Sequence, residues 1–313
     1  MLLPKPLSNA MNPRALALLA ATAASAIYGI NHTIAKDLMP NIIGPYGFIV
    51  LRVVGAAVLF WIISMFYPSE KVDRKDWLRF AACAFFGMVL NMNMFFKGLE
   101  LSTPINSSVV ITLTPVLLLV LTAVFLKEKI TWMKSVGIGL GLVGALLLIL
   151  FGAKTQPNAP NIPLGNMLFI VNASSYAIYL IIVKPLVAKY NSVTLMKFFF
   201  LIAIFMNLPI GLTQFTEVAW SSLGFDVLWK MGFVVVGTTV LTYLFNVYAL
   251  KQLSPSTIGA FIYLQPVLAT LFAIFMGADS LNSLRIAAAA LIFIGVFLST
   301  RTPSKKRITA QES

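Results

Sequence analysis

The residues of this sequence that could take part in chemistry are few, and they lie inside long apolar stretches. Arg52 is the most unusual of them, because it stands about ten residues into the stretch 43–66 and no acidic residue lies inside any apolar stretch. At about 1.5 Å per residue a helix would place it near the middle of a membrane, where a charge costs at least ~2.5–3.5 kcal/mol on insertion scales. Arg52 is therefore expected to face a cavity. Two interpretations are equally open: it binds a substrate anion, or it binds backbone carbonyl groups of a broken helix.

His32 is the one histidine of the sequence, and histidine titrates near neutrality. It could couple transport to protons, but we favour a hydrogen-bonded structural residue near the end of the first apolar stretch. Cys83 lies in an apolar run and is expected to be a small buried hydrophobic residue. One histidine, with acids confined to loops, makes no metal or acid–base cluster, so neither a metal site nor a cofactor is expected.

Two prolines inside apolar stretches, Pro115 and Pro266, indicate helix irregularities. Each is expected to remove a backbone donor in mid-helix and to free a carbonyl of the preceding turn. Interrupted helices at matching positions point to a central binding site; the alternative is a packing kink satisfied by nearby polar side chains. Those side chains are Thr112, Thr114, Tyr263 and Gln265.

Other polar residues inside the apolar stretches are candidates for the wall of the same cavity. Residues three apart share a helical face, as Tyr176 and Tyr179 do, and as Tyr243 and Asn246 do. Hydrogen bonds between packed helices are the competing explanation. The complete candidate set is Asn31, His32, Arg52, Asn91, Asn93, Thr112, Thr114, Pro115, Tyr176, Tyr179, Tyr243, Asn246, Tyr263, Gln265 and Pro266.

The amino-acid composition indicates the class of protein to which these residues belong. The chain is 59% hydrophobic and 11% charged, its mean hydropathy is +0.90, and soluble domains carry about 25% charged residues. It is expected to be an integral membrane protein, in which each spanning helix needs roughly 20 apolar residues. Ten stretches qualify: 15–36, 43–66, 78–98, 104–126, 132–152, 163–184, 191–214, 229–250, 255–277 and 283–300.

The basic residues orient these stretches. With the N-terminus in the cytoplasm, 16 of the 23 Lys and Arg residues fall on the cytoplasmic side and five on the other. Cytoplasmic loops of membrane proteins carry such an excess, so both termini are predicted to be cytoplasmic and the protein to be a multi-pass inner-membrane protein. The basic tail, residues 302–313, is expected to lie against anionic lipid, and no nucleic-acid partner is expected.

The chain contains an internal repeat. At an offset of 151 Leu99 meets Leu250, Pro115 meets Pro266 and Gly144 meets Gly295; at 148 Tyr28 meets Tyr176 and Lys36 meets Lys184. Five spans in each half is an odd number, so the second half must enter the membrane from the opposite side. The sequence predicts an all-α membrane protein of ten transmembrane helices in two inverted five-helix repeats. Its parts are a first half (1–153), a linker (154–163), a second half (164–301) and the tail.

These motifs resemble a known family. Gly98-Leu99, a Ser/Thr-Pro helix start, Pro115-Val116, Leu126-Lys127-Glu128-Lys129, Gly137 and Gly144, with SAIYGINHTIAK and PYGFIVLRVVGA, are similar to the EamA-like family of the drug/metabolite transporter superfamily. The resemblance covers nearly the whole chain. It implies ten helices in two inverted halves and the movement of small organic solutes such as amino acids, other metabolites or drugs. The second half departs from it with Asp279 where the first half has Glu128.

A secondary transporter is the expected function, acting as an exporter or exchanger by alternating access between the halves. No Walker-type phosphate loop is present, so ATP is not the expected energy source. The expected partners are a small-molecule substrate and the lipid bilayer. The close spacing of Gly137, Gly141 and Gly144 suits helix packing within the chain or a homodimer contact. A membrane-embedded enzyme and a non-transporting membrane protein are the alternatives.

Overall fold

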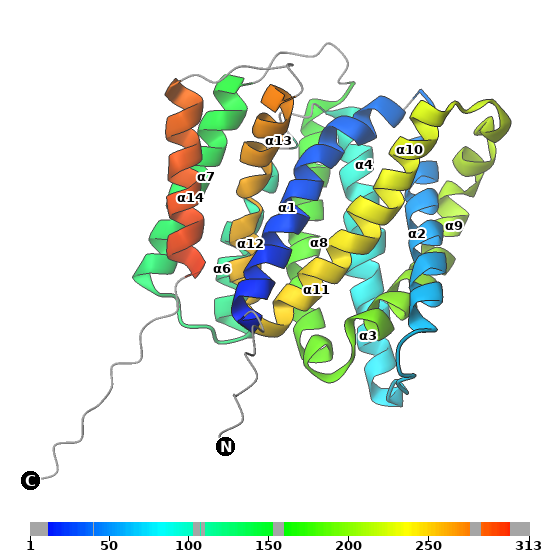
Figure 1. The fold of residues 1–313 in the computed structure, drawn as a ribbon, viewed down its shortest axis with the longest axis horizontal. Coiled ribbons are helices and arrows are strands. Elements are labelled where there is room, and N and C mark those ends of the chain that lie inside the picture. Colours follow the sequence, from blue (N-terminus) through cyan, green and yellow to red (C-terminus); the bar gives the residue numbers. More distant parts are fainter. Residues whose placement is uncertain are drawn as a thin grey trace, which may run out of the picture.

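The computed structural model describes residues 12–39, 41–102, 107, 110–152, 160–275 and 283–300, and within these ranges the regular elements are all helical (Figure 1). The elements are α1 (Pro13–Leu38), α2 (Pro45–Ser64), η1 (Arg74–Asp76), α3 (Trp77–Ala84), η2 (Phe85–Leu90), α4 (Asn91–Leu101), α6 (Thr114–Phe125), α7 (Trp132–Gly152), α8 (Ile162–Lys189), α9 (Ser192–Thr216), η3 (Trp220–Ser222), α10 (Phe225–Phe233), η4 (Val234–Leu241), α11 (Thr242–Gln252), α12 (Pro255–Phe261), α13 (Leu264–Phe275) and α14 (Ser283–Thr300).

The helices have the length and composition of membrane spans. Within the described residues, six helical stretches are long and apolar enough to cross a bilayer: Pro13–Asn31, Pro45–Ser64, Arg74–Leu101, Ile162–Lys189, Ser192–Thr216 and Phe225–Gln252. Thr114–Phe125 and Ile286–Thr300 are shorter apolar helices. The prediction of an all-helical multi-pass membrane protein is confirmed, whereas the count of ten spans and the inverted repeat stay predictions.

Local sequence signals start several of these helices. A proline occupies the first turn of α1, α2, α8 and α12, where its missing N–H costs nothing. Asn161 Oδ1 accepts from Leu164 N at 3.1 Å, and Ser254 Oγ accepts from Thr257 N at 3.3 Å. These side chains satisfy backbone donors that a helix start leaves without intrahelical acceptors.

Two predicted spans, 78–98 and 229–250, contain π-helical segments, η2 and η4. A π-helical turn leaves backbone carbonyls without their usual partners. Side chains supply replacements: Ser175 Oγ donates to Phe86 O at 2.7 Å, and Tyr243 OH donates to Gly87 O at 2.9 Å. In η4, Thr239 Oγ1 donates to Val234 O at 2.9 Å. The extra residue in each turn rotates the side chains that follow it, which changes the residues that face the centre of the bundle.

The prolines Pro115 and Pro266 lie in the first turns of α6 and α13, and this corrects the prediction that they remove donors in mid-helix. Just before each of them, at 112–113 and again at 262–263, a turn with hydrogen bonds to the third preceding residue interrupts the α-helical pattern. Both stretches are therefore broken helices, and each proline follows its break. The first turn is where proline is best tolerated.

Close backbone contacts hold the two edges of the bundle. α7 and α14 stand side by side at one edge, and α2 and α9 pack together at the other (Figure 1). A Cβ atom on Gly137 would lie 2.6 Å from Gly295 O, and one on Gly211 would lie 2.3 Å from Tyr46 O. Of the two roles expected for Gly137, a helix contact within the chain and a homodimer contact, the structure shows the contact within the chain.

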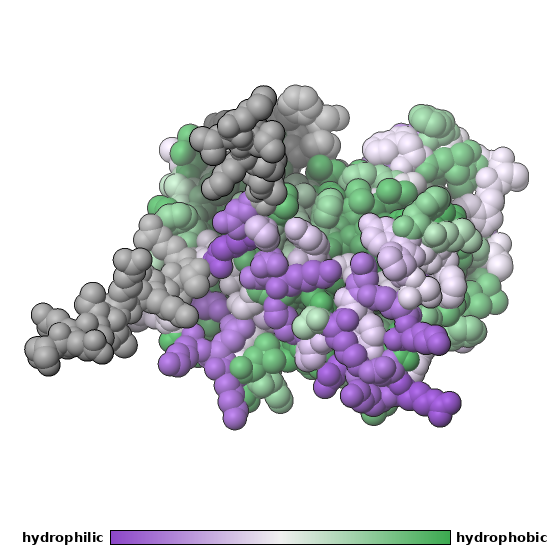
Figure 2. Space-filling model, turned by 60° about the horizontal axis from the view of Figure 1, so that its bottom comes forward, coloured by the Kyte–Doolittle hydropathy of each residue, from purple (hydrophilic) through white to green (hydrophobic). Residues whose placement is uncertain are grey.

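The surface divides into a polar end and apolar flanks. Hydrophilic residues gather at the end of the bundle where α1 begins and α14 ends (Figure 2). Arg14 joins these two helix ends through a hydrogen bond from its guanidinium to Thr300 O. Large apolar side chains are exposed elsewhere, such as Val58 on α2 and Phe205 on α9, as a surface in contact with lipid requires. The exposed basic residues of the chain include Lys71, Arg74, Lys75, Arg79, Lys127, Lys129, Lys189 and Lys251.

Candidate functional site

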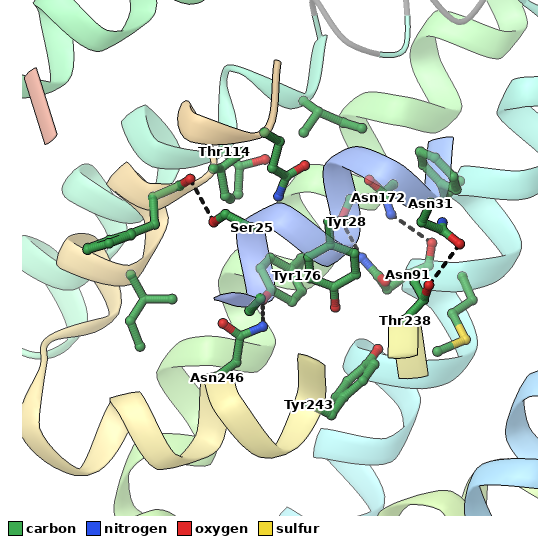
Figure 3. A pocket seen from close by; sticks show the side chains of 18 of the residues that line it. Ser25, Tyr28, Asn31, Asn91, Thr114, Asn172, Tyr176, Thr238, Tyr243 and Asn246 are labelled. Atoms are coloured by element: carbon green, nitrogen blue, oxygen red, sulfur yellow. Dashed lines mark hydrogen bonds between the residues drawn. The ribbon is translucent and has the colours of Figure 1, made fainter. Parts of the chain in front are cut away.

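A cavity of about 130 Å³ lies among helices from the N-terminal and C-terminal parts of the chain. Its labelled polar side chains come from α1, α4, α6, α8, η4 and α11 and converge on one space (Figure 3). At about 30 Å³ of liquid volume for each water molecule, the cavity has room for about four waters. The lining residues are Ala24, Ser25, Tyr28, Asn31, Arg52, Asn91, Met92, Phe95, Phe96, Ile111, Thr114, Asn172, Tyr176, Thr238, Tyr243, Asn246, Ile258, Phe261, Ile262 and Gln265.

Arg52 reaches this cavity from α2, and only 5% of its surface is exposed. Its Nε donates to Thr239 Oγ1 at 3.0 Å, and its Cζ lies 5.3 Å from the centroid of the Phe96 ring. Among the described side chains, no acidic group forms an ion pair with it. Thr239 belongs to η4, so the guanidinium is oriented by the irregular helix that the sequence did not reveal.

Asparagines tie the cavity walls together. Asn91 Nδ2 donates to Asn172 O at 3.3 Å, and Asn172 Nδ2 donates to Asn91 O at 2.8 Å, which clamps α4 to α8. Thr238 Oγ1 donates to Asn31 Oδ1 at 2.9 Å and joins η4 to α1. These bonds satisfy buried polar groups, and they fix which atoms of each amide remain available to a ligand.

Tyrosine and serine complete the wall. Asn246 Nδ2 lies 3.4 Å from Tyr176 OH, and Ser25 Oγ donates to Phe261 O at 2.9 Å, beside the break between α12 and α13. Tyr28, Tyr176 and Tyr243 surround one part of the space in Figure 3. The site is thus lined by amide, hydroxyl and guanidinium groups together with aromatic rings.

The structure brings part of the predicted set to the cavity. Its wall includes Asn31, Arg52, Asn91, Thr114, Tyr176, Tyr243, Asn246 and Gln265. Substrate binding by these residues stays a prediction. The side chain of His32 lies outside the described part of the structure, although its backbone belongs to α1.

The other predicted residues do not line the cavity: Asn93, Thr112, Pro115, Tyr179, Tyr263 and Pro266. Asn93 faces α9, where its Nδ2 donates to Asn207 Oδ1 at 2.7 Å and to Val89 O at 2.8 Å. Tyr179 is 1% exposed and packs against Gly87, and Tyr263 packs against Gly141. Thr112 lies in the turn before α6, where it is 2% exposed.

Replacing Asn93 by leucine is expected to destabilise the protein by about 1–3 kcal/mol, because Asn207 Oδ1 would then be buried without a donor. The change should leave the cavity wall intact. Thermal unfolding in detergent measures the loss, and the double variant Asn93→Leu/Asn207→Leu is the control. Since it removes both partners, it should be more stable than the single variant. An additive loss in the double variant would contradict a coupled pair.

Sequence reasoning missed several lining residues: Ser25, Tyr28, Asn172 and Thr238, with the apolar wall around Phe95 and Phe96. Two of them carried a usable signal. Tyr28 is the repeat partner of Tyr176, and Asn172 lies four residues before Tyr176, on the same helical face. Thr238 carried none, because the helical spacing changes within η4.

The cavity wall combines a few polar groups with apolar surface. The described residues contain no group of three or more His, Cys, Asp or Glu that could hold a metal ion. The described polar atoms on the wall are amides, hydroxyls and one guanidinium, while the remaining lining is apolar. This combination of a few placed polar groups with apolar surface is typical of a small-molecule site.

A second polar cluster joins segments far apart in the chain, at the end of the bundle that carries the exposed basic residues. Glu128 Oε2 accepts from Lys134 Nζ at 2.9 Å and from Ser256 Oγ at 2.8 Å. Lys127 and Lys129 are the basic residues next to Glu128 in the chain, yet its ion pair is with Lys134. Lys184 Nζ donates to the carbonyls of Leu250 and Leu253 at the C-terminal end of α11, the latter at 2.8 Å. We call Glu128, Lys134, Lys184, Ser254 and Ser256 the cytoplasmic cluster, after the orientation that the distribution of basic residues predicts.

Comparisons with known proteins agree on transport. A protein of Archaeoglobus fulgidus named an uncharacterized transporter is 28% identical over 262 residues, which cover 83% of this chain and 90% of the relative. The uncharacterized transporter YyaM of Bacillus subtilis is 23% identical over 78% of this chain and 81% of its own length. A WAT1-related protein of Arabidopsis thaliana is 22% identical, covering 90% and 83% of the two chains.

The fold and the family agree with these relatives. A protein crystal structure superposes with a TM-score of 0.76 over 91% of this chain and 96% of its own, at 18% sequence identity, which shows a shared fold. The model of the EamA-like transporter family matches residues 15–150 and residues 163–301, and this confirms the resemblance seen in the sequence. The chain belongs to the EamA-like transporter family, a family of membrane transporters in the drug/metabolite transporter superfamily.

Proposed function

We propose that the protein is a secondary transporter that moves small organic solutes through the central cavity by alternating access of two inverted five-helix halves. It works as an exporter or exchanger of metabolites such as amino acids, or of drugs. The observation that carries the proposal is the cavity itself, which is lined by polar side chains from both halves. Central sites at the interface of repeats are the general plan of secondary transporters.

Residues related by the repeat meet at the cavity and support this plan. At an offset of 151, Ile111 corresponds to Ile262 and Thr114 to Gln265; at 148, Tyr28 corresponds to Tyr176. All six line the cavity. An arrangement around a pseudo-two-fold axis would bring corresponding residues to the same space, as inverted repeats require.

The packing of whole helices follows the same relation. α1 packs along α11, and α4 packs along α8; under the repeat α8 corresponds to α1 and α4 to α11. The helix pairs α2·α9 and α7·α14 each join an element to its own counterpart. The π-helical segments η2 and η4, and the breaks before α6 and α13, also fall at corresponding positions. These correspondences, and the family match to two segments, support two halves at 1–153 and 164–301.

The membrane orientation follows from the basic residues. We place the end that carries Lys71, Arg74, Lys75 and Arg79 in the cytoplasm, with both termini, because cytoplasmic loops carry the excess of Lys and Arg. This puts the protein in the inner membrane with the cytoplasmic cluster on the cytoplasmic side of the cavity. A homodimer contact stays a prediction.

The cytoplasmic cluster is the proposed closure of one access route. Its hydrogen bonds tie the loop after α6 in the first half to the start of α12 in the second half. Lys184 ties α8 to the C-terminal end of α11, where exposed carbonyls favour a cation. Opening toward the cytoplasm has to break the contacts of Ser256 with Glu128 and of Ser254 with Lys134, which join the two halves. This gives alternating access a two-state element.

Flux in proteoliposomes tests the proposal. Vesicles of the purified protein, preloaded with unlabelled amino acids, organic acids, nucleosides or dyes, should exchange at least one labelled solute faster than empty vesicles. Ala24→Phe would fill the cavity and should abolish that flux, because Ala24 lines the wall. Val58→Phe adds the same ring on the exposed face of α2 and should leave the flux unchanged. Absence of flux for every solute, with and without a pH gradient, would exclude the proposed function.

A further inference from the structure

The central cavity carries an uneven charge. Arg52 is the one charged residue among the described residues that line it, and no acidic side chain shares the wall. A guanidinium is always protonated in proteins, so this space holds a fixed positive charge surrounded by apolar and neutral polar groups. A buried charge without a counter-charge costs free energy. A negatively charged ligand at this site would supply the counter-charge for Arg52.

The binding capacity of Arg52 is only partly used. The structure records one hydrogen bond of its side chain among the described residues, from Nε to Thr239 Oγ1. The Phe96 ring stacks near the guanidinium, with 5.3 Å between Cζ and the ring centroid. Both contacts orient the planar fork and leave the terminal N–H groups to the cavity. A fork of parallel N–H groups matches the two oxygens of a carboxylate.

The neighbouring amides also favour an anion over a cation. Asn31 accepts from Thr238 Oγ1 through Oδ1, so its amide nitrogen remains as a donor. Asn91 and Asn172 each use one N–H of the side-chain amide on the other's backbone carbonyl, so each keeps one N–H donor and its side-chain oxygen for a ligand. An ammonium group in this small space would meet the positive charge of Arg52 and no compensating carboxylate. Neutral amide oxygens offset that repulsion only weakly.

The remaining wall is apolar and of limited size. Phe95, Phe96, Phe261 and Ile258 face the cavity and would hold a hydrocarbon body by burial of apolar surface. The cavity volume of about 130 Å³ favours a small solute.

We infer that the transported solute is a small monocarboxylate with an apolar body, bound as a net anion with its carboxylate on Arg52. This inference rests on the proposed transport function and narrows its substrate class. It separates the protein from a carrier of amines, which needs an acidic group in the site, and from one that prefers zwitterionic amino acids.

Binding to the purified protein in detergent tests the inference. The probes are isovalerate, benzoate and hydrocinnamate, each measured beside its amide and the amine of the same carbon skeleton, with phenylalanine as the zwitterionic partner of hydrocinnamate. At least one carboxylate should bind about tenfold or more tighter than its amide and its amine. Hydrocinnamate should bind more tightly than phenylalanine, because the two differ by the ammonium group alone.

Variants connect the selectivity to Arg52. Arg52→Gln should weaken binding of the selected carboxylate about 30-fold or more, the scale for removing one partner of a buried hydrogen-bonded charge pair. Lys197→Gln is the matched control, because Lys197 lies over the rings of Trp61 and Phe198, away from the cavity. It should bind as the parent does. If Arg52→Gln does not fold, Asn91→Asp replaces it: a carboxylate on the wall should weaken carboxylate binding and strengthen amine binding.

The outcomes separate this inference from the transport proposal. Flux of amines or neutral solutes, with carboxylates bound no better than their amides, overturns the anion site and leaves transport standing. Selective carboxylate binding that depends on Arg52, without flux of any solute, supports the site and overturns transport. Equal binding of carboxylates by the parent and Arg52→Gln also overturns the inference.

Discussion

Gly137→Val is expected to destabilise the protein by about 3 kcal/mol or more, the upper end of the range for overpacking a well-packed site. A Cβ on Gly137 would lie 2.6 Å from Gly295 O and 2.7 Å from Ser299 N. Both contacts are to backbone atoms of α14, which cannot move aside as the end of a flexible side chain can. The helices α7 and α14 would have to separate along the edge of the bundle.

Gly139→Val on the same helix is the matched control. A Cβ at Gly139 meets no atom within 4 Å, so both variants add the same valine to α7 and differ in what the side chain meets. Thermal unfolding in detergent, followed by loss of the monodisperse peak in size-exclusion chromatography, measures the difference. Equal stability of the two variants would show that the α7–α14 contact does not hold the bundle together.

Glu128→Gln is expected to open the cavity toward the cytoplasm, with a population shift of about 5- to 150-fold, the range that couplings of 1–3 kcal/mol produce. The change removes the negative charge that holds Lys134, and it weakens the acceptor of Ser256. The side chain of Lys134 is 14% exposed and that of Glu128 is 23% exposed. Salt therefore screens this ion pair less than a pair at the surface.

Labelling of a single cysteine measures this shift. Cys83 is replaced by alanine, and Ser25, on the cavity wall, is replaced by cysteine. A membrane-impermeant maleimide is then applied to the cytoplasmic face of inside-out vesicles. Glu128→Gln should accelerate labelling from this face.

Glu100→Gln is the control for the labelling experiment, because Glu100 pairs with Lys97 at 2.8 Å inside α4 and ties no second helix. Its labelling rate should equal that of the parent. An unchanged rate in Glu128→Gln, or the same acceleration in both variants, would exclude the cytoplasmic cluster as the closure.

The sequence alone could predict some residues of the cavity wall, but it could not separate them from nearby residues that face another helix. Asn91 and Asn93 are two residues apart and looked equivalent in the sequence, yet Asn91 lines the cavity and Asn93 bonds Asn207 on α9. Residues two apart point to different sides of a helix. Only knowledge of which helix packs on which side could separate them.

The same limit explains the missed residues. Thr238 and Thr239 lie in η4, where an extra residue per turn changes the faces that regular helical spacing predicts. Thr239 accepts a hydrogen bond from Arg52, and Thr238 donates one to Asn31. Part of the site's geometry therefore depends on a π-helical segment that the amino-acid composition of η4 does not indicate. Glu128 likewise accepts a hydrogen bond from Ser256, which lies 128 residues further along the chain.

The sequence by itself determined the membrane class, the family and the residue that carries the charge of the cavity, and it predicts the inverted repeat. Each depends on composition, chain order or the cost of burying a charge, and these are properties of single residues and short segments. The tertiary structure decided that Pro115 and Pro266 follow helix breaks as first-turn residues, and that Arg52 meets a wall without an acid. These depend on contacts between segments far apart in the chain, which no local pattern of residues encodes.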